Sequence, residues 1–170
     1  RSFGAVPIID KAGSAAQPKR NLVADVYKFI KQDLEYAAAN LPEKSLKKGY
    51  VNKTVAMGVL AKVHLTLHEY AECASLTQEI MGTQYSLIQE YGNLFSSPEN
   101  NNSAESMFAL QWKAIATEWG TQNTNQAYIV PNGTGITGGG DGWGVYLRSI
   151  SLQERFGPKD CRKKNTIMTD

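Results

Sequence analysis

Two histidines are the first candidates for reactive chemistry in this chain of 170 residues. His64 and His68 are four residues apart, which is one helical turn and a spacing found in pairs of metal-binding histidines. The zinc-protease pattern also places a glutamate between its histidines, and this chain has none there. We therefore interpret both histidines as parts of a helical framework and expect no metal and no cofactor.

The two cysteines offer no stronger case for catalysis. Cys73 falls on the apolar side of a helical pattern and is interpreted as a small buried residue. Cys161 has charged neighbours on both sides, which favour exposure and a thiolate, but no histidine or asparagine completes a recognisable local motif. Neither cysteine is predicted to be a nucleophile.

Carboxylates and glycines do not form a catalytic pattern either. Glu99, Glu105 and Glu118 stand singly, so their spacing predicts no acid/base pair. The stretch GTGITGGGDG lacks the Gly-Lys-Ser/Thr ending of a phosphate-binding loop. The sequence therefore predicts no catalytic residue, and a hydrolase with scattered carboxylates is the weakest alternative.

Aromatic and short polar side chains occur together between residues 113 and 147. The C–H faces of sugar rings stack on aromatic planes, while sugar hydroxyls need amide and carboxylate partners. The alternative is that these aromatic residues pack in the interior. We predict that this segment binds a carbohydrate through Trp119, Tyr128, Trp143, Tyr146, Asn123 and Asp141.

Composition excludes several classes of protein. Eighteen Lys and Arg residues against sixteen Asp and Glu residues give a formal net charge of only +2, which does not favour nucleic-acid binding. No apolar run approaches the roughly 20 residues that a membrane-spanning helix needs. The first residues, RSFGAVPIID, do not match a signal peptide.

The first half of the chain has helical periodicity. Residues 1–21 are expected to form an extended arm, with Asn21 as a possible N-cap for a helix over 22–41. Apolar positions over 55–67 and 73–80 then predict two helices joined by a very short turn, the first beginning at Asn52 or Thr54.

The second half has weaker patterns. Residues 106–112 alternate and predict a short strand, and a further helix is expected over 149–156, ended by Gly157 and Pro158. We therefore predict a mainly α fold of tetratricopeptide-like helical hairpins with long irregular loops and a short strand. The whole chain, 1–170, is expected to be one domain: an arm (1–21), a helical core (22–95), a strand with a loop-rich insertion (96–147), and a C-terminal helix with a tail (148–170).

Several motifs together resemble one protein family. Leu60, Ala61, Tyr70 and Cys73 fit part of the tetratricopeptide pattern. The order of VYKFIKQDLEYAAANLP, NKTVAMGVLAKVHLTLHEYAECASLTQEIM, YSLIQEYGNLF and NSAESMFALQW resembles the SusD/RagB family of bacterial nutrient-binding proteins. The later segment SLQERFGPKDCRKKNTI is similar to the family's Phe-x-x-x-Asp-x-Arg segment through Phe156, Asp160 and Arg162. His68 departs from the pattern, because such hairpins usually have glycine at the turn.

The resemblance implies a function as well as a fold. Members are longer than this chain, so the chain is interpreted as an internal fragment. The resemblance implies an outer-membrane lipoprotein at the cell surface, whose lipid anchor lies outside this chain. Such a protein captures a glycan or oligosaccharide without covalent chemistry and passes it to a SusC-like TonB-dependent transporter. The alternative is a helical-repeat module that binds another protein and no sugar.

Overall fold

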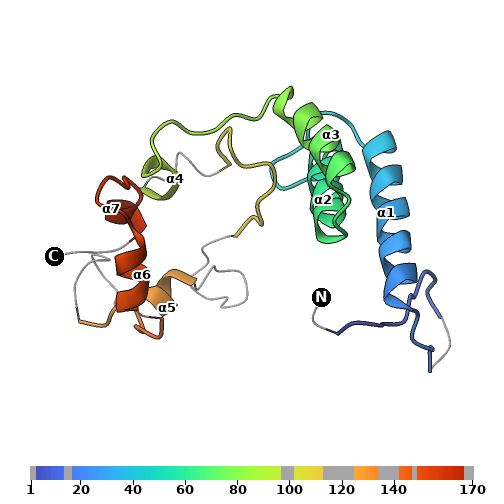
Figure 1. The fold of residues 1–170 in the computed structure, drawn as a ribbon, viewed down its shortest axis with the longest axis horizontal. Coiled ribbons are helices and arrows are strands. Elements are labelled where there is room, and N and C mark those ends of the chain that lie inside the picture. The colour runs from blue at the N-terminus through green and yellow to red at the C-terminus, as the bar shows by residue number, and fades with distance from the viewer. Residues whose placement is uncertain are drawn as a thin grey trace. The chain divides into compact units, whose positions relative to one another are not determined.

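The computed structural model describes residues 3–13, 17–96, 102–112, 125–133, 142–146 and 149–166. These residues form helices and irregular segments, without a sheet (Figure 1). The chain divides into two compact units, Arg1–Leu87 with Ala104–Ala109 and Ile88–Ser103 with Leu110–Asp170. The expected mainly helical fold is confirmed, while its organisation as one domain stays a prediction.

Helix α1, Val23–Asn40, confirms the helix expected over 22–41. It ends just before Pro42, which lacks the N–H needed to continue a helix. Asn21 does not cap this helix, because Leu22 occupies the N-cap position and makes no capping bond. The Asn21 side chain instead accepts a hydrogen bond from the Ile8 N–H at 3.0 Å, so it ties the N-terminal arm to the start of α1.

Helices α2, Lys53–Thr66, and α3, Tyr70–Met81, form the predicted hairpin. Asn52 is the N-cap of α2, and its side-chain oxygen accepts a hydrogen bond from the Val55 N–H at 3.0 Å. The same side chain donates to the Tyr85 hydroxyl at 2.9 Å and to the Ser45 hydroxyl at 3.1 Å. Asn52 is completely buried, so these bonds satisfy its amide where water cannot.

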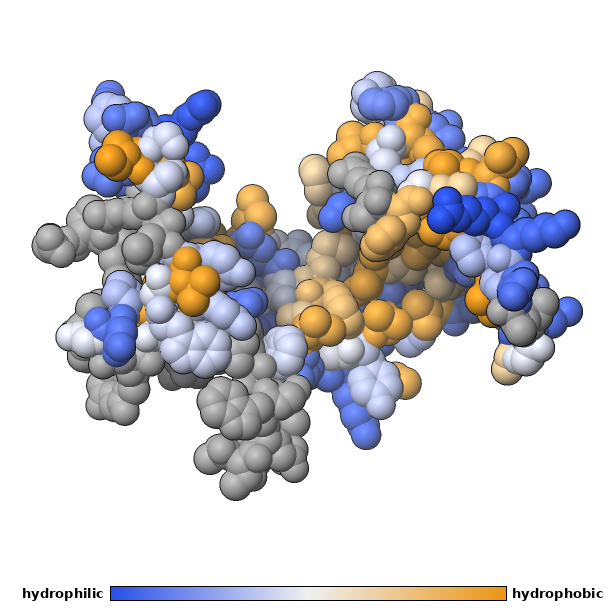
Figure 2. All heavy atoms as spheres, turned by 90° about the horizontal axis from the view of Figure 1, so that it is seen from below, coloured by the Kyte–Doolittle hydropathy of each residue, from blue (hydrophilic) through white to orange (hydrophobic). Residues whose placement is uncertain are grey.

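The core of the first unit lies along α2, which packs against both α1 and α3. Its buried apolar residues are Val55, Ala56, Met57, Leu60 and Ala61. Many larger apolar side chains of this unit are exposed, and Figure 2 shows apolar surface gathered on the face of the unit that it presents. Among these three helices, α2 packs against both of the others, so it supplies most of the core.

The strand predicted over 106–112 is not formed. Residues 104–109 belong to the first unit, where the Ser86 N–H donates to the Ala104 carbonyl. Met107 lies against α2 so closely that a Cβ on Gly58 would come within 2.9 Å of its Cε. Alternation alone does not make a strand, because a strand forms only when its main chain pairs with that of a neighbouring strand.

The described part of the second unit contains four short helices. These are α4, Asn93–Ser96; α5, Asn125–Ile129; α6, Ile150–Arg155; and α7, Lys163–Thr166. Helix α6 confirms the helix expected over 149–156, and the Ser149 hydroxyl caps it by accepting a hydrogen bond from the Leu152 N–H. Helices this short gain little from their own hydrogen bonds, so their contacts with neighbouring segments hold them.

No described helix combines the length and the apolar character that crossing a membrane would require.

Candidate functional site

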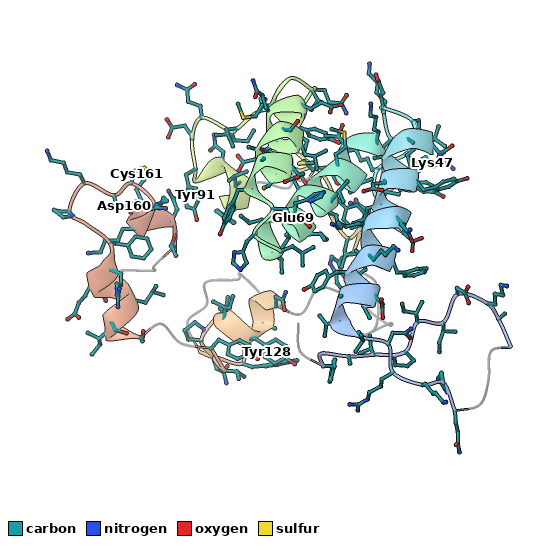
Figure 3. All side chains as sticks on the ribbon, turned by 45° about the vertical axis from the view of Figure 1, so that its right-hand side comes forward. Lys47, Glu69, Tyr91, Tyr128, Asp160 and Cys161 are labelled. Atoms are coloured by element: carbon teal, nitrogen blue, oxygen red, sulfur yellow. The ribbon has the colours of Figure 1, made fainter. Side chains whose placement is uncertain are left out.

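Three of the predicted sugar-binding residues lie in contact in the second unit. The Tyr128 ring on α5 is 5.0 Å from the Trp143 ring, centroid to centroid, with the two planes at 86°. On another side, the Tyr128 ring is 5.5 Å from the Tyr146 ring at 41°. We call Tyr128, Trp143 and Tyr146 the aromatic cluster; Figure 3 labels its central residue. Edge-to-face and tilted contacts of this kind are the arrangements that aromatic pairs prefer.

Main-chain hydrogen bonds position the aromatic cluster. The Trp143 N–H donates to the Ala127 carbonyl, and the Tyr146 N–H donates to the Tyr128 carbonyl at 2.9 Å. Between them, the Gly144 N–H donates to the Val130 carbonyl at 3.0 Å. The segment 142–146 therefore follows α5 closely, and two residues that are 15 or more positions from Tyr128 reach its ring.

Two glycines permit this approach. A Cβ on Gly142 would lie 1.9 Å from the Val130 carbonyl oxygen, a distance that no real side chain tolerates. Gly144 has a φ of +59°, in the left-handed region that side chains disfavour. At these two positions, glycine therefore has a specific structural role.

The aromatic cluster is open to solvent. Trp143 is 50% exposed, Tyr146 is 65% exposed, and Tyr128 between them is half-buried. Ile129 and Val145, which neighbour these residues in the sequence, are exposed as well. The other predicted binding residues, Trp119, Asn123 and Asp141, lie outside the described residues. Those that the structure describes are therefore brought together on an accessible surface.

The two histidines belong to the framework, as predicted. His64 is buried, and its Nδ1 donates to Oε2 of Glu69 at 2.5 Å. Glu69, labelled in Figure 3, also accepts a hydrogen bond from the Lys31 ammonium on α1; the Nζ–Oε1 distance is 2.9 Å. Lys31 and then His64 lower the pKa of Glu69 through these hydrogen bonds. Because this network connects α1 to the turn of the hairpin, the role of His64 is structural.

His68 occupies the turn itself and has a φ of +63°. This conformation explains why related hairpins use glycine at the same position. The His68 Nδ1 lies 2.8 Å from the Tyr70 hydroxyl, a contact between two exposed side chains. The described part of the chain contains no group of three or more His, Cys, Asp or Glu side chains that could hold a metal ion.

Both cysteines are free thiols. Cys161 is exposed, as predicted from its charged neighbours. Cys73 is half-buried, so the expectation of full burial is wrong. It lies on α3, which has no fully buried residue because α2 covers only one side of it.

The Phe-x-x-x-Asp-x-Arg residues surround a small pocket in the second unit. Phe156, Asp160 and Arg162 line it together with Tyr91, and its volume is about 290 Å³. Figure 3 labels Tyr91 and Asp160. Arg162 donates to both carboxylate oxygens of Asp160, at 2.9 and 2.6 Å. These bonds lower the pKa of Asp160 to about 2. The bonding fixes the path of the chain between α6 and α7, which gives this motif a structural role.

Sequence reasoning did not single out Tyr91 or Arg155, which also line this pocket. Tyr91 packs edge-on against Phe95, with ring centroids 5.2 Å apart. The available signal was the close spacing of these two aromatic residues, four positions apart, which favours a packing contact between them. Arg155 carried no signal, because a single basic residue at the end of a helix is usually solvated.

Two curated proteins are similar to this chain in sequence. One is a SusD-like protein from Bacteroides ovatus, 33% identical over 159 residues, which cover 85% of this chain and 28% of the relative. The other is SusD-like protein P2 from Formosa agariphila, 27% identical over 99% of this chain and 35% of the relative. The chain thus spans about a third of the length of these relatives. No protein-family profile matches it.

Solved structures share the fold. A protein solved with a xylogluco-oligosaccharide is 31% identical, with a TM-score of 0.72 over 88% of this chain and 33% of that one. Surface glycan-binding protein A from Bacteroides thetaiotaomicron, solved with laminarihexaose, is 23% identical, with a TM-score of 0.77 over 95% and 37%. A SusD superfamily protein from Bacteroides vulgatus is 24% identical, with a TM-score of 0.59 over 64% and 24%.

The sequence matches extend over most of the chain and include the helical hairpin, while the solved structures reproduce its helical arrangement. These findings agree with the motifs identified in the sequence. This chain is SusD-like, and it corresponds to about a third of the length of its SusD-like relatives.

Proposed function

We propose that this chain forms part of a glycan-binding protein and that the aromatic cluster contacts the sugar directly. The observation that carries this proposal is the contact among Tyr128, Trp143 and Tyr146, with two of the rings at least half exposed. Exposed aromatic planes bind the C–H faces of sugar rings. The 31% identical protein solved with a xylogluco-oligosaccharide supports the same class of ligand.

Binding in this proposal involves no covalent step. Stacking, shape and hydrogen bonds supply the affinity, and an open surface of a few rings gives weak binding to each short oligosaccharide. Longer glycans gain affinity when they engage several contacts at once. The cluster therefore serves to hold a polymer near the protein rather than to react with it.

We propose a role for the whole protein as well. We place it at the bacterial outer-membrane surface, where it captures glycans and delivers them to a SusC-like TonB-dependent transporter. Attachment to the membrane would come from a lipid anchor outside this chain. The likeness to SusD-like proteins supports this role, which remains part of the proposal.

Calorimetric titration of the intact protein with plant and algal glycans tests the binding site. Trp143→Ala and Tyr146→Ala are each expected to weaken binding roughly tenfold, the loss of about 1.4 kcal/mol that one aromatic contact can supply. Trp112→Ala is a matched control, because Trp112 is 52% exposed and lies outside the cluster. Tyr36→Ala on α1 is the matched control for Tyr146→Ala, since Tyr36 is 72% exposed.

The same experiment separates sugar binding from protein binding. Unchanged affinity in both cluster variants, with unchanged folding, would remove the aromatic cluster as the site. Absence of any glycan binding, together with a stable complex with another protein, would favour the helical-repeat interaction module. Release of reducing sugar from any glycan would instead support the hydrolase alternative.

A further inference from the structure

Basic side chains are concentrated between the end of α6 and the start of α7. Five of the eighteen Lys and Arg residues lie within the ten positions 155–164: Arg155, Lys159, Arg162, Lys163 and Lys164. These ten positions contain one carboxylate, Asp160, so they carry four more positive charges than negative ones. The whole chain has an excess of only two, so the positive charge is a local property of this region.

Asp160 neutralises only one of these charges. Its two oxygens accept hydrogen bonds from the Arg162 guanidinium, and Oδ1 also accepts one from the Arg162 N–H at 3.0 Å. Within the ranges that the structure describes, neither Lys163 nor Lys164 forms an ion pair, and Arg155 forms none either. The charges of these three side chains are therefore available to a ligand.

The two lysines lie at a pocket. Lys163 and Lys164 line a cavity of about 400 Å³ together with Asp160 and Cys161, which are both labelled in Figure 3. Lys163 is half-buried and Lys164 is exposed. Because the Asp160 carboxylate is paired with Arg162, the net charge at this pocket is positive. A volume of this size accommodates a carboxylate or sulfate group with the sugar that carries it.

The main chain holds both lysines in place. The Lys163 N–H donates to the Asp160 carbonyl at 3.2 Å. Helix α7 also packs tightly against the residue before α4, because a Cβ on Gly92 would lie 2.8 Å from Oδ1 of Asn165. The two lysines therefore extend from an ordered turn, and an anion that binds there need not order the chain first.

We infer that the pocket lined by Lys163 and Lys164 binds the anionic group of an acidic glycan, which is a uronate carboxylate or a sulfate ester. This inference rests on the proposed function and specifies its ligand class. Ammonium groups bind such anions through charge-assisted hydrogen bonds. A bilayer presents a plane of headgroups, which meets a protruding surface rather than a pocket, so the concave site favours a substituent of a glycan over a membrane lipid.

Titration of the intact protein with acidic and neutral oligosaccharides tests the inference. The acidic probes are hexagalacturonic acid and a carrageenan hexasaccharide, and the neutral probe is laminarihexaose. We expect at least one acidic probe to bind roughly fivefold more tightly than the neutral one, the value of two partly exposed ion pairs. This advantage should shrink when NaCl is raised from about 50 mM to about 500 mM, because salt screens exposed charges.

Paired lysine variants show whether this pocket carries the preference. The double variant Lys163→Gln, Lys164→Gln should lose the advantage of the acidic probe and keep its affinity for the neutral one. The double variant Lys47→Gln, Lys48→Gln is the matched control, because it removes the same charge from an exposed lysine pair of the first unit (Figure 3 labels Lys47). Unchanged Tm and circular dichroism of both variants show that they fold.

The Cys161 thiol reports on binding without any substitution, because it is exposed and lines the same pocket. The bound acidic probe should slow alkylation of Cys161 by iodoacetamide, followed by peptide mass spectrometry, whereas laminarihexaose should not. Cys73 on α3 is the internal control, and its rate of alkylation should stay the same.

Three results would overturn the inference. If the acidic probes bind no more tightly than laminarihexaose, while Trp143→Ala still weakens laminarihexaose binding, the lysine pocket is no glycan site but the proposed function stands. If the acidic advantage is real but both lysine pairs reduce it equally, or Cys161 is not protected, the charge acts without a specific pocket. If no glycan binds, and vesicles with anionic phospholipid bind wild type but not the Lys163 and Lys164 variant, the surface meets a membrane and the proposed function fails as well.

Discussion

Oε2 of Glu69 lies 2.5 Å from Nδ1 of His64, beside the turn that joins α2 to α3. The same carboxylate accepts a hydrogen bond from Lys31 on α1. One charged side chain thus connects three helices of the first unit. The network includes one histidine of the pair whose spacing resembles a metal site, and it explains why that histidine is buried.

Glu69→Gln is expected to destabilise the first unit at neutral pH and to lower Tm by a few degrees. Lys31 and His64 lower the pKa of Glu69 below its usual value of 4.5. A carboxylate with a lowered pKa contributes stability above its unfolded pKa, and this contribution is lost as the pH falls through the folded value. The stability difference between wild type and variant should therefore narrow below about pH 4.5.

Thermal unfolding followed by circular dichroism between pH 3 and pH 8 measures this difference. Glu72→Gln is the matched control, because Glu72 is an exposed carboxylate in the first turn of α3. Its effect should be small at every pH. A Glu69 variant that is as stable as wild type at neutral pH would contradict a stabilising role for the network.

Asn52→Ala should destabilise the chain by about 2 kcal/mol, the sum of a lost helix cap and a buried partner left without its bond. Asn52 is completely buried, and its side chain accepts a hydrogen bond from the Val55 N–H and donates one to the Tyr85 hydroxyl. Chemical denaturation measures the change. Asn40→Ala is a suitable comparison, since Asn40 is exposed and its loss should cost less than about 0.5 kcal/mol. Equal effects of the two substitutions would show that burial of Asn52 does not matter.

His68→Gly should be more stable than His68→Ala by about 1 kcal/mol. Both variants lose the contact with Tyr70, but only glycine relieves the strain of a φ of +63°. The stability difference between the two variants therefore measures the backbone strain at residue 68 separately from the loss of the side-chain contact. Urea denaturation of the two variants gives the difference directly, and equal stability would mean that the turn adapts at no cost.

Gly142→Ala should weaken glycan binding roughly tenfold, because the added methyl group would overlap the Val130 carbonyl and separate 142–146 from α5. Helical content should change little, since the affected segment is irregular. Gly157→Ala makes the same substitution where no atom lies within 4 Å, so it should leave binding unchanged. Near-ultraviolet circular dichroism would detect the altered surroundings of Trp143, and full affinity in the Gly142 variant would argue against a preformed cluster.

Local patterns predicted the helical framework well. The period of the apolar residues located α1 and the hairpin, and Asn52, one of the two residues predicted to begin α2, is its N-cap. Periodicity succeeds here because a helix buries one side against its neighbours, and that side must recur at helical spacing. The Asn21 cap failed because a more distant partner, Ile8, competes for the same side chain.

The residue types of the candidate site could be predicted from the sequence, but their arrangement in space could not. Ring chemistry singled out Tyr128, Trp143 and Tyr146 as predicted binding residues, yet no local pattern could show that they meet, because the hydrogen bonds that bring them together connect main-chain groups. The strand predicted over 106–112 failed for a related reason. Its alternation was real, but pairing depends on a partner that the pattern does not contain.

The main-chain bonds between 142–146 and α5 also bear on how this surface could evolve. Every amino acid except proline carries the same N–H and carbonyl groups, so replacing Trp143 or Tyr146 leaves those bonds available. Mutation can therefore exchange one ring for another, or for a polar group, without dismantling the loop. Under the proposed function, exchange of these two residues would change which glycan binds, while the two glycines preserve the main-chain path of the loop.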